Sequence, residues 1–209
     1  MSEPLSPLER RNAIHPRFVP LRCNRCDHPL REWNPDKDDW NQFTCGNPDG
    51  PHMQWIQSPP VAYVVLLNVD DYTTYTVERA IPPIGEWCFP GGYVDYGETA
   101  EETIVHETAG EACIRIAGKP VNYLGQLFEP GLGVTVIGFL VRINRADVDD
   151  FAPNKEATAR REDIFWDLDP NILAFNGNRL MLEAARNLVR AERDRKLAQP
   201  FPATRREPL

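Results

Sequence analysis

The sequence has no long hydrophobic run, and no apolar stretch reaches the roughly 18 residues that a bilayer-crossing helix needs. Residues 1–10 also lack the hydrophobic core of a signal peptide. Positive charge is in short supply, because 23 Lys and Arg stand against 31 Asp and Glu, a formal net charge of −8. We therefore expect a soluble protein with no membrane partner and no general nucleic-acid-binding surface, although a local basic patch stays open.

Cysteine is also scarce, and the five cysteines form no even framework of the kind that holds a small secreted fold together. An odd number of cysteines fits a reducing cytoplasm better than a disulfide scaffold. With 209 residues, of which 42% are hydrophobic, the chain can bury a proper core. We expect one main domain with a small appendage.

Residues 85–114 are the stretch around which the chain is organised. Pro90, Gly91 and Gly92, followed by Gly97, force tight turns because proline and glycine interrupt regular elements. A helix is predicted from about Thr99 to Ala112, with an acidic first turn that suits the positive end of its dipole. Its expected apolar side consists of Ala100, Ile104, Val105, Ala109 and Ala112.

Two acidic residues of this helix, Glu107 and Glu111, are four positions apart and therefore lie on one face, about one turn from each other. Carboxylates held side by side repel each other unless a cation lies between them. Hard oxygen ligands are what Mg²⁺ prefers, usually together with substrate phosphates. The sequence predicts a site for Mg²⁺ or Mn²⁺ here; the alternative is a solvated acidic helix face.

This stretch resembles the Nudix box, a glycine, five residues, a glutamate, seven residues and then Arg-Glu-hydrophobic-any-Glu-Glu-any-Gly-hydrophobic. The lead-in from Trp87 to Gly92 matches the family as well. The box positions that match in register are Gly92, Glu98, Glu107, Glu111 and Ile114. The positions that depart are His106 for the arginine, Thr108 for a hydrophobe, Gly110 for the middle glutamate and Cys113 for the glycine.

The resemblance implies the Nudix fold, an α+β architecture in which helices cover a mixed sheet as an α/β/α sandwich. It also implies roles for individual residues in the Mg²⁺ site: metal ligation by Glu111, ligation or water orientation by Glu107, and a backbone carbonyl ligand at Gly92. Glu98 is counted in the same site, where it supports the loop and the metal-bound waters. Without a carboxylate at Gly110, Mg²⁺ binding should be weaker than is usual in the family. His106 cannot form the bidentate fork of an arginine, but it can donate one hydrogen bond.

Ahead of this core, residues 21–57 contain Cys23 and Cys26, followed by a looser pair, Cys45 and His52. Cysteines separated by two residues form half of a zinc knuckle, and the looser pair can complete it, with His28 as a competing fourth ligand. The segment has too little apolar content to fold unaided, so structural Zn²⁺ is predicted; thiols in an unstructured arm are the alternative. The layout resembles zinc-ribbon Nudix proteins such as NADH pyrophosphatases.

The hydrophobic pattern predicts a buried strand at 61–69 that forms a hairpin with an exposed edge strand at 73–79. Other expected elements are strands at 85–90, 121–128, 132–143 and 164–169, a polar loop at 151–163 and a closing amphipathic helix at 178–198. That helix is expected to bury Leu180, Leu182, Ala185 and Leu188 and to expose Arg186, Arg190, Arg193 and Arg195. The expected division is an irregular lead at 1–20, a zinc-ribbon-like segment at 21–57, a Nudix domain at 58–199 and a tail at 200–209.

Residues outside the box complete the expected site. Arg79 lies where Nudix proteins often carry a basic residue near the substrate, although a solvated arginine explains it as well. Glu156, in the polar loop, is the first candidate for the general base or a further metal ligand, with Glu129 second and Glu162 third. Gly92 and Glu129 are also candidate substrate contacts. Each of these acids has a simpler explanation as a solvated loop residue.

The resemblance favours Mg²⁺-dependent hydrolysis of a nucleoside diphosphate linked to another moiety, with ADP-ribose or an NADH-like dinucleotide as substrate. Pro130 lies where ADP-ribose pyrophosphatases carry a proline, although Glu129-Pro130-Gly131 is also a plain turn. A Nudix-fold module that binds such a nucleotide without cleaving it is the competing hypothesis, favoured by Gly110 and His106. The candidate walls for a base are Tyr93, Tyr96 and Phe128. A homodimer is expected from the resemblance alone.

Overall fold

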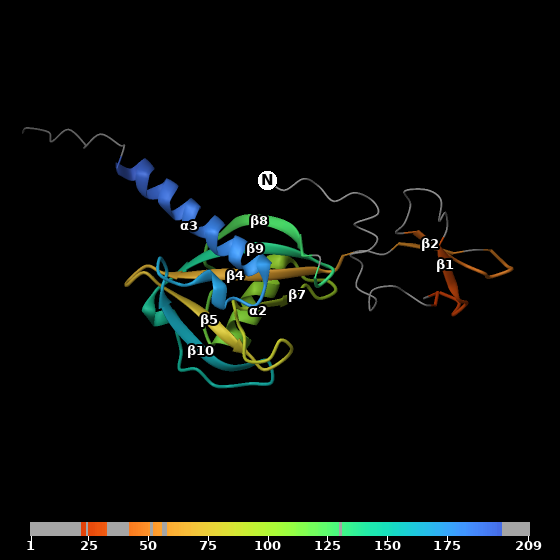
Figure 1. Ribbon diagram of the computed structural model, residues 1–209, viewed down its shortest axis with the longest axis horizontal. Coiled ribbons are helices and arrows are strands. Elements are labelled where there is room, and N and C mark those ends of the chain that lie inside the picture. Colours follow the sequence, from red (N-terminus) through yellow and green to blue (C-terminus); the bar gives the residue numbers. More distant parts are fainter. Residues whose placement is uncertain are drawn as a thin grey trace, which may run out of the picture.

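The computed structural model describes residues 22–23, 25–32, 42–50, 52–55, 58–129 and 131–197. The expected lead at 1–20, the tail at 200–209 and Pro130 lie outside these residues. The described part consists of a small sheet near the amino terminus and a larger body, which Figure 1 shows apart from each other. The division of the chain near residue 57 stays a prediction. None of the helices in the described ranges has the length and apolar character needed to cross a bilayer.

The small sheet is antiparallel, in the order β1-β2-β3, and consists of β1 (Leu30–Glu32), β2 (Gln42–Cys45) and β3 (Met53–Trp55). Strands this short bury little apolar surface and are not stable on backbone pairing alone. Two of the side chains buried here are Cys23 and Cys45, which are 3% and 1% exposed. The sheet therefore needs a further stabilising interaction, such as a bound metal ion, and its buried thiols are groups that can provide the ligands.

The larger body contains two sheets and two helices. The four-stranded sheet, in the order β7-β4-β9-β8, consists of β4 (Pro60–Asn68), β7 (Gly91–Tyr93), β8 (Val121–Glu129) and β9 (Val134–Ile143). The three-stranded sheet, in the order β10-β5-β6, consists of β5 (Thr73–Arg79), β6 (Trp87–Cys88) and β10 (Ala157–Ile164). The helices are α2 (Ala100–Ala112) and α3 (Asn176–Leu197), with short 3₁₀ turns η2 (Arg145–Asp147) and η3 (Pro170–Ile172). Among the strands described, β4 and β9 pair in parallel and the other pairs are antiparallel, so the mixed α+β sandwich is confirmed.

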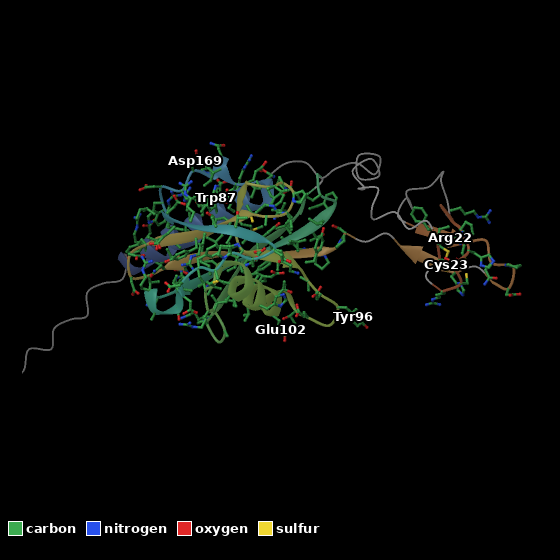
Figure 2. All side chains as sticks on the ribbon, turned by 90° about the horizontal axis from the view of Figure 1, so that it is seen from below. Arg22, Cys23, Trp87, Tyr96, Glu102 and Asp169 are labelled. Carbon is green, nitrogen blue, oxygen red and sulfur yellow. The ribbon has the colours of Figure 1, made fainter. Side chains whose placement is uncertain are left out.

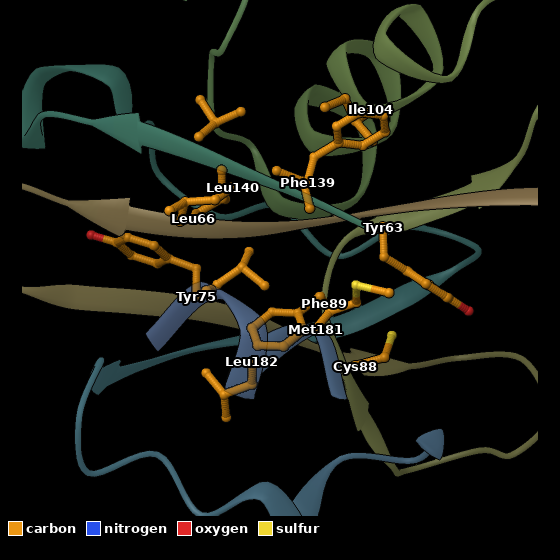
Figure 3. Packing of buried hydrophobic residues seen from close by; sticks show 14 of the residues in the cluster. Tyr63, Leu66, Tyr75, Cys88, Phe89, Ile104, Phe139, Leu140, Met181 and Leu182 are labelled. Carbon is orange, nitrogen blue, oxygen red and sulfur yellow. The ribbon is translucent and has the colours of Figure 1, made fainter. Parts of the chain in front are cut away.

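The two helices cover opposite faces of β4 and β9. A Cβ atom on Gly138 of β9 would lie 1.9 Å from the sulfur of Met181, so α3 packs directly on that face. The next residue along the strand points the other way, and Figure 3 shows Phe139 beside Ile104 of α2. Because β4 is covered on both faces, all residues from 61 to 68 are buried. Each large apolar side chain buried in this way contributes about 1.5–3 kcal/mol.

The predicted hairpin between 61–69 and 73–79 is wrong. β4 and β5 belong to different sheets, and β5 lies between β10 and β6 rather than at an edge. The chain leaves β4 through Tyr72, whose φ of 58° redirects it into the second sheet. Thr74 and Thr76 alternate with apolar residues, a pattern that predicts one solvent-exposed face of the strand, but both threonines are fully buried. Threonine is β-branched and packs in a strand much as valine does.

The strand predicted at 164–169 is also wrong, because β10 ends where that strand was expected to begin. Most of the expected polar loop at 151–163 therefore belongs to β10. This strand lies at the edge of its sheet and, within the part of the chain that the structure describes, pairs with β5 alone, so its charged side chains can reach water. The pattern of a solvated edge strand resembles that of a loop.

The closing helix is confirmed, but its faces differ in part from the prediction. Leu182 and Ala185 are buried as expected, whereas Leu180 is 42% exposed and Met181 packs in its place. Arg186 was expected on the solvated face. Its guanidinium instead donates hydrogen bonds of 2.8–3.1 Å to the backbone oxygens of Phe165, Trp166 and Leu168. This arginine therefore fastens α3 to the turn that follows β10.

Replacing Cys113 with glycine is expected to raise the free energy of unfolding by about 1 kcal/mol. Cys113 ends α2 with φ of 54° and ψ of 45°, a left-handed conformation that disfavours any residue with a Cβ atom. It stands where the Nudix pattern has glycine. Urea denaturation of Cys113→Gly and Cys113→Ala measures the effect, since alanine removes the thiol without relieving the backbone. Equal stability of the two variants would contradict the prediction.

Candidate active site

The start of α2 is fixed by a capping box that sequence analysis missed. The Thr99 hydroxyl accepts a hydrogen bond of 3.2 Å from the Glu102 backbone N–H, and the Glu102 carboxylate accepts one of 2.8 Å from the Thr99 N–H. A threonine followed three residues later by glutamate is the usual sequence signal for this arrangement, so it could have been found. Figure 2 shows Glu102 and Tyr96 at the outer surface, near the turn that leads into the helix. The cap sets the phase of the helix and so the direction in which its later carboxylates point.

Three carboxylates meet beside the glycine turn. One oxygen each from Glu107, Glu111 and Glu156 lie within 4.8 Å of one another. The Gly91 N–H donates a hydrogen bond of 3.0 Å to Glu111, which is only 7% exposed. A Cβ atom on Gly92 would lie 2.0 Å from a carboxylate oxygen of Glu107. The two glycines thus allow the strand β7 to approach both helix carboxylates closely.

Burial dominates the electrostatics of this cluster. It raises the pKa of Glu111 to about 7. The hydrogen bond from the Gly91 N–H lowers this pKa, the negative charges of Glu107 and Glu156 raise it further, and the positive charge of Arg79 lowers it. Burial likewise raises the pKa of Glu107, which the neighbouring His106 counteracts. Three crowded carboxylates, one of them almost fully buried, resist ionisation unless a cation compensates them. Their hard oxygen donors fit Mg²⁺ or Mn²⁺.

The metal-free protein is expected to lose stability, through Glu111, as the pH rises from 5 to 7.5. Because the folded pKa is raised from 4.5 to about 7, the folded state holds a proton in this range that the unfolded chain has released. That stabilisation is complete below the unfolded pKa and is lost as the pH passes about 7. Melting temperatures of the wild type and Glu111→Gln across this range isolate the effect, and parallel curves would contradict it. Added Mg²⁺ should stabilise the wild type more at pH 7.5 than at pH 5.

Glu98, expected near the metal, is not one of the three clustered carboxylates. Its side chain accepts a hydrogen bond of 3.2 Å from the Thr103 hydroxyl and lies 3.3 Å from Nδ1 of His106. Nε2 of the same imidazole is 3.6 Å from Glu107. His106 therefore lies between Glu98 and Glu107. A role of Glu98 in the surroundings of the metal stays a prediction.

Of the three candidate acids outside the box, the structure brings only Glu156 into the cluster. Glu129 accepts a hydrogen bond of 2.6 Å from the Gly177 N–H at the start of α3, where a negative charge also suits the helix dipole. Glu162 forms an ion pair of 2.7 Å with Arg145. Both therefore have structural partners of their own.

Arg79 lies at the end of β5, in the strand position from which a substrate contact was predicted. Its guanidinium carbon is 4.8 Å from the centre of the Phe175 ring, and it donates a hydrogen bond of 2.6 Å to the backbone oxygen of Pro82. The aromatic residues proposed as walls for a base are all exposed, namely Tyr93, Tyr96 and Phe128. Substrate contacts by any of these residues stay predictions.

A second cluster lies on the small sheet and consists of the residues predicted to bind zinc, Cys23, Cys26, Cys45 and His52. Their ligand atoms also lie within 4.8 Å of one another. His28 is not a member, because its ring lies 3.1 Å from the backbone oxygen of Cys26 instead. No disulfide joins the five cysteines.

The distances within this second cluster match a tetrahedral site. Sulfur to sulfur, Cys26 and Cys45 are 3.7 Å apart, and Nδ1 of His52 lies 3.6 Å from Cys23 and 3.7 Å from Cys45. For zinc–sulfur bonds of about 2.3 Å, the edge of a tetrahedron is about 3.8 Å. The His52 N–H also donates to the Cys45 sulfur and is the main cause that lowers the pKa of that thiol to about 6, which favours the thiolate.

Known proteins similar to this chain agree with the fold. The family model for the NUDIX domain matches residues 58–168. No curated protein matches the sequence. Among solved structures, the chain is similar to a NUDIX hydrolase from Nitrosomonas europaea, with a TM-score of 0.55, 21% identity, and coverage of 86% of this chain and 94% of that chain.

Two other similar structures contain or act on nucleotides according to their descriptions. An Ap4A hydrolase from C. elegans, in a binary complex, has a TM-score of 0.52 and 20% identity over 63% of this chain and 98% of that chain. The NUDIX domain of NrtR from Shewanella oneidensis, complexed with ADP ribose, has a TM-score of 0.52 and 16% identity over 64% of this chain and 89% of that chain. At these identities the likeness shows a shared fold.

Proposed function

The chain belongs to the Nudix family of hydrolases, and from that premise we propose that it hydrolyses the diphosphate bond of a nucleoside diphosphate linked to another moiety. The observation that carries this proposal is the meeting of Glu107, Glu111 and Glu156 beside the glycine turn. A cluster of solvated surface acids would not include a carboxylate that is 7% exposed and bonded to a backbone N–H.

In this proposal Glu107 and Glu111 hold Mg²⁺ or Mn²⁺, together with the backbone carbonyl of Gly92. When bound, the metal supplies positive charge that offsets the charge of the diphosphate oxygens. A Glu156 carboxylate oxygen accepts a proton from the attacking water as the new phosphorus–oxygen bond forms and the bridging bond to the leaving phosphate breaks. The positive charge of Arg79 assists by binding a phosphate group.

ADP-ribose or an NADH-like dinucleotide is the substrate that we propose. Support comes from the NUDIX domain of Shewanella NrtR, which is similar in fold and was crystallised with ADP ribose. Incubation with ADP-ribose, NADH, diadenosine tetraphosphate and capped RNA, with and without Mg²⁺, tests the proposal by chromatography of the products. We expect Mg²⁺-dependent turnover that is fastest with one of the first two.

A nucleotide-binding module without activity is the second candidate, because Gly110 removes the middle carboxylate of the box. Glu156 brings a third carboxylate to the cluster, which supports the enzyme instead. Calorimetry separates the two functions. Measurable affinity for ADP-ribose without turnover of any compound in the panel would rule out the hydrolase.

We further propose that the second cluster binds structural zinc, which the near-tetrahedral spacing of Cys23, Cys26, Cys45 and His52 supports. About one zinc per chain is expected in purified protein, measured by elemental analysis. Replacing Cys45 with serine should remove the metal and expose the small sheet to proteolysis, whereas Cys113→Ser should retain it. A folded preparation without zinc would contradict the proposal. The cytoplasmic location and the homodimer stay predictions.

A further inference from the structure

Glu156 differs from the other two carboxylates because no helix holds it. It lies just before β10, in a segment that is solvent-exposed from residue 152 to residue 155. A carboxylate on such a segment needs its backbone fixed before it can act on a bound water, because a displacement of about 1 Å can cost 10²-fold in rate. The contacts of the segment identify the residue that does this.

Asn154 connects the segment to the helix that carries the other two carboxylates. Its side-chain oxygen accepts hydrogen bonds from the backbone N–H groups of Glu156, at 2.8 Å, and Ala157, at 2.9 Å. Its side-chain nitrogen donates a hydrogen bond of 2.8 Å to the backbone oxygen of Gly110 in α2. One amide group therefore contacts both the peptide of Glu156 and the residue that precedes Glu111.

The Gly110 carbonyl can accept this bond because of its place in the helix. The last four carbonyls of an α-helix have no intrahelical donor, and α2 ends at Ala112. Arg160 of β10 satisfies another of them, donating a hydrogen bond of 2.6 Å to the Ala112 oxygen. The end of α2 is thus bonded to the segment that carries Glu156 through Asn154, and to β10 through Arg160.

Other contacts of Glu156 do not replace this one. The Ala80 N–H donates a hydrogen bond of 2.8 Å to the Glu156 backbone oxygen, which fixes the peptide to the end of β5 but not to α2. Lys155 lies 3.1 Å from the carboxylate, but its side chain is 89% exposed, and ion pairs this exposed contribute little. Among the described residues, Asn154 is the one whose side chain spans α2 and Glu156.

We infer that Asn154 is a positioning residue, whose side-chain amide holds the Glu156 carboxylate against Glu107 and Glu111 by bridging the Gly110 carbonyl and the Glu156 peptide. The inference rests on the proposed function, in which Glu156 accepts a proton from water. Gly110 stands where the Nudix box has its middle glutamate. The third carboxylate of the cluster comes instead from Glu156, whose segment is hydrogen-bonded to the backbone carbonyl of Gly110.

Asn154→Ala is expected to lower kcat about 10- to 100-fold and to leave KM nearly unchanged. It should also weaken Mn²⁺ binding measured by calorimetry, because the negative charge of Glu156, within 4.8 Å of the two proposed ligands, adds to the attraction of a cation. Asn154→Ser keeps a short acceptor for the turn but cannot reach Gly110, so it should show the same loss with the fold retained. Asn187→Ala, on the exposed face of α3, is the matched control and should match the wild type in both measurements.

A double-mutant cycle with Glu156→Gln decides whether Asn154 acts through Glu156. If it does, Asn154→Ala causes no further loss in a Glu156→Gln background. The inference is overturned if the two losses multiply, or if Asn154→Ala and Asn154→Ser behave like Asn187→Ala. If the wild type turns over no substrate, the proposed function is wrong. The role of Asn154 is then tested by the same double-mutant cycle, with Mn²⁺ affinity as the measured quantity. A wild type that binds no Mn²⁺ overturns both.

Discussion

Glu111→Gln is expected to lower kcat about 10²–10³-fold while the protein keeps its fold. Glutamine has nearly the same size, and its side-chain oxygen can still accept the hydrogen bond that the Gly91 N–H donates at 3.0 Å. The substitution removes the negative charge of a carboxylate that we propose as a ligand of the divalent cation. The assay is steady-state hydrolysis of ADP-ribose at saturating Mg²⁺, with circular dichroism as the test of folding.

Stability distinguishes this prediction from simple damage. Because burial raises the pKa of Glu111 to about 7, the ionised carboxylate destabilises the metal-free folded protein near neutral pH. Glu111→Gln should therefore melt at the same or a higher temperature than the metal-free wild type at pH 7.5. Glu101→Gln, an exposed acid in the first turn of the same helix, is the control and should retain activity. Full activity in Glu111→Gln would remove Glu111 from the site.

The parts of the site that sequence predicts are those set by local geometry. Helical spacing alone places Glu107 and Glu111 on one face, and the cysteine spacing identifies most of the second cluster. The choice of Glu156 over Glu129 and Glu162 came from a family likeness, and three-dimensional contacts decide which of the three acids lies in the cluster. Glu129 is occupied by the start of α3, and Glu162 by Arg145.

The errors concern partners that are distant in the sequence. The chain from β4 to β5 looks like a hairpin, because nothing in the turn reveals that the two strands join different sheets. Arg186 looks solvated, since its acceptors are backbone oxygens of a turn some 20 residues earlier. Asn154 gives no signal at all, because an asparagine in a polar loop is unremarkable until its amide is seen to contact α2. Backbone acceptors are present at every position, so sequence cannot identify which one a side chain will find.

The adjacent glycines of the box are expected to fail in different ways when each is replaced by alanine. At Gly91 the new Cβ atom would lie 2.1 Å from the backbone oxygen of Ala62, which neither strand can move without losing the pairing of β7 with β4. Gly91→Ala should therefore reduce the free energy of unfolding by about 1–3 kcal/mol or more. Urea denaturation measures this loss.

At Gly92 the three atoms nearest to the new Cβ atom all belong to the flexible side chain of Glu107, with a carboxylate oxygen at 2.0 Å and the carboxyl carbon at 2.7 Å. The side chain can turn away, so Gly92→Ala should keep nearly wild-type stability. When the Glu107 side chain turns away, its carboxylate leaves the position beside Glu111. This displacement should lower kcat/KM about 10- to 100-fold and weaken Mn²⁺ binding. If the loss arises through Glu107, Gly92→Ala adds little to Glu107→Gln. Wild-type activity in Gly92→Ala would contradict this prediction. It would mean that metal binding does not depend on the present position of the Glu107 carboxylate beside Gly92.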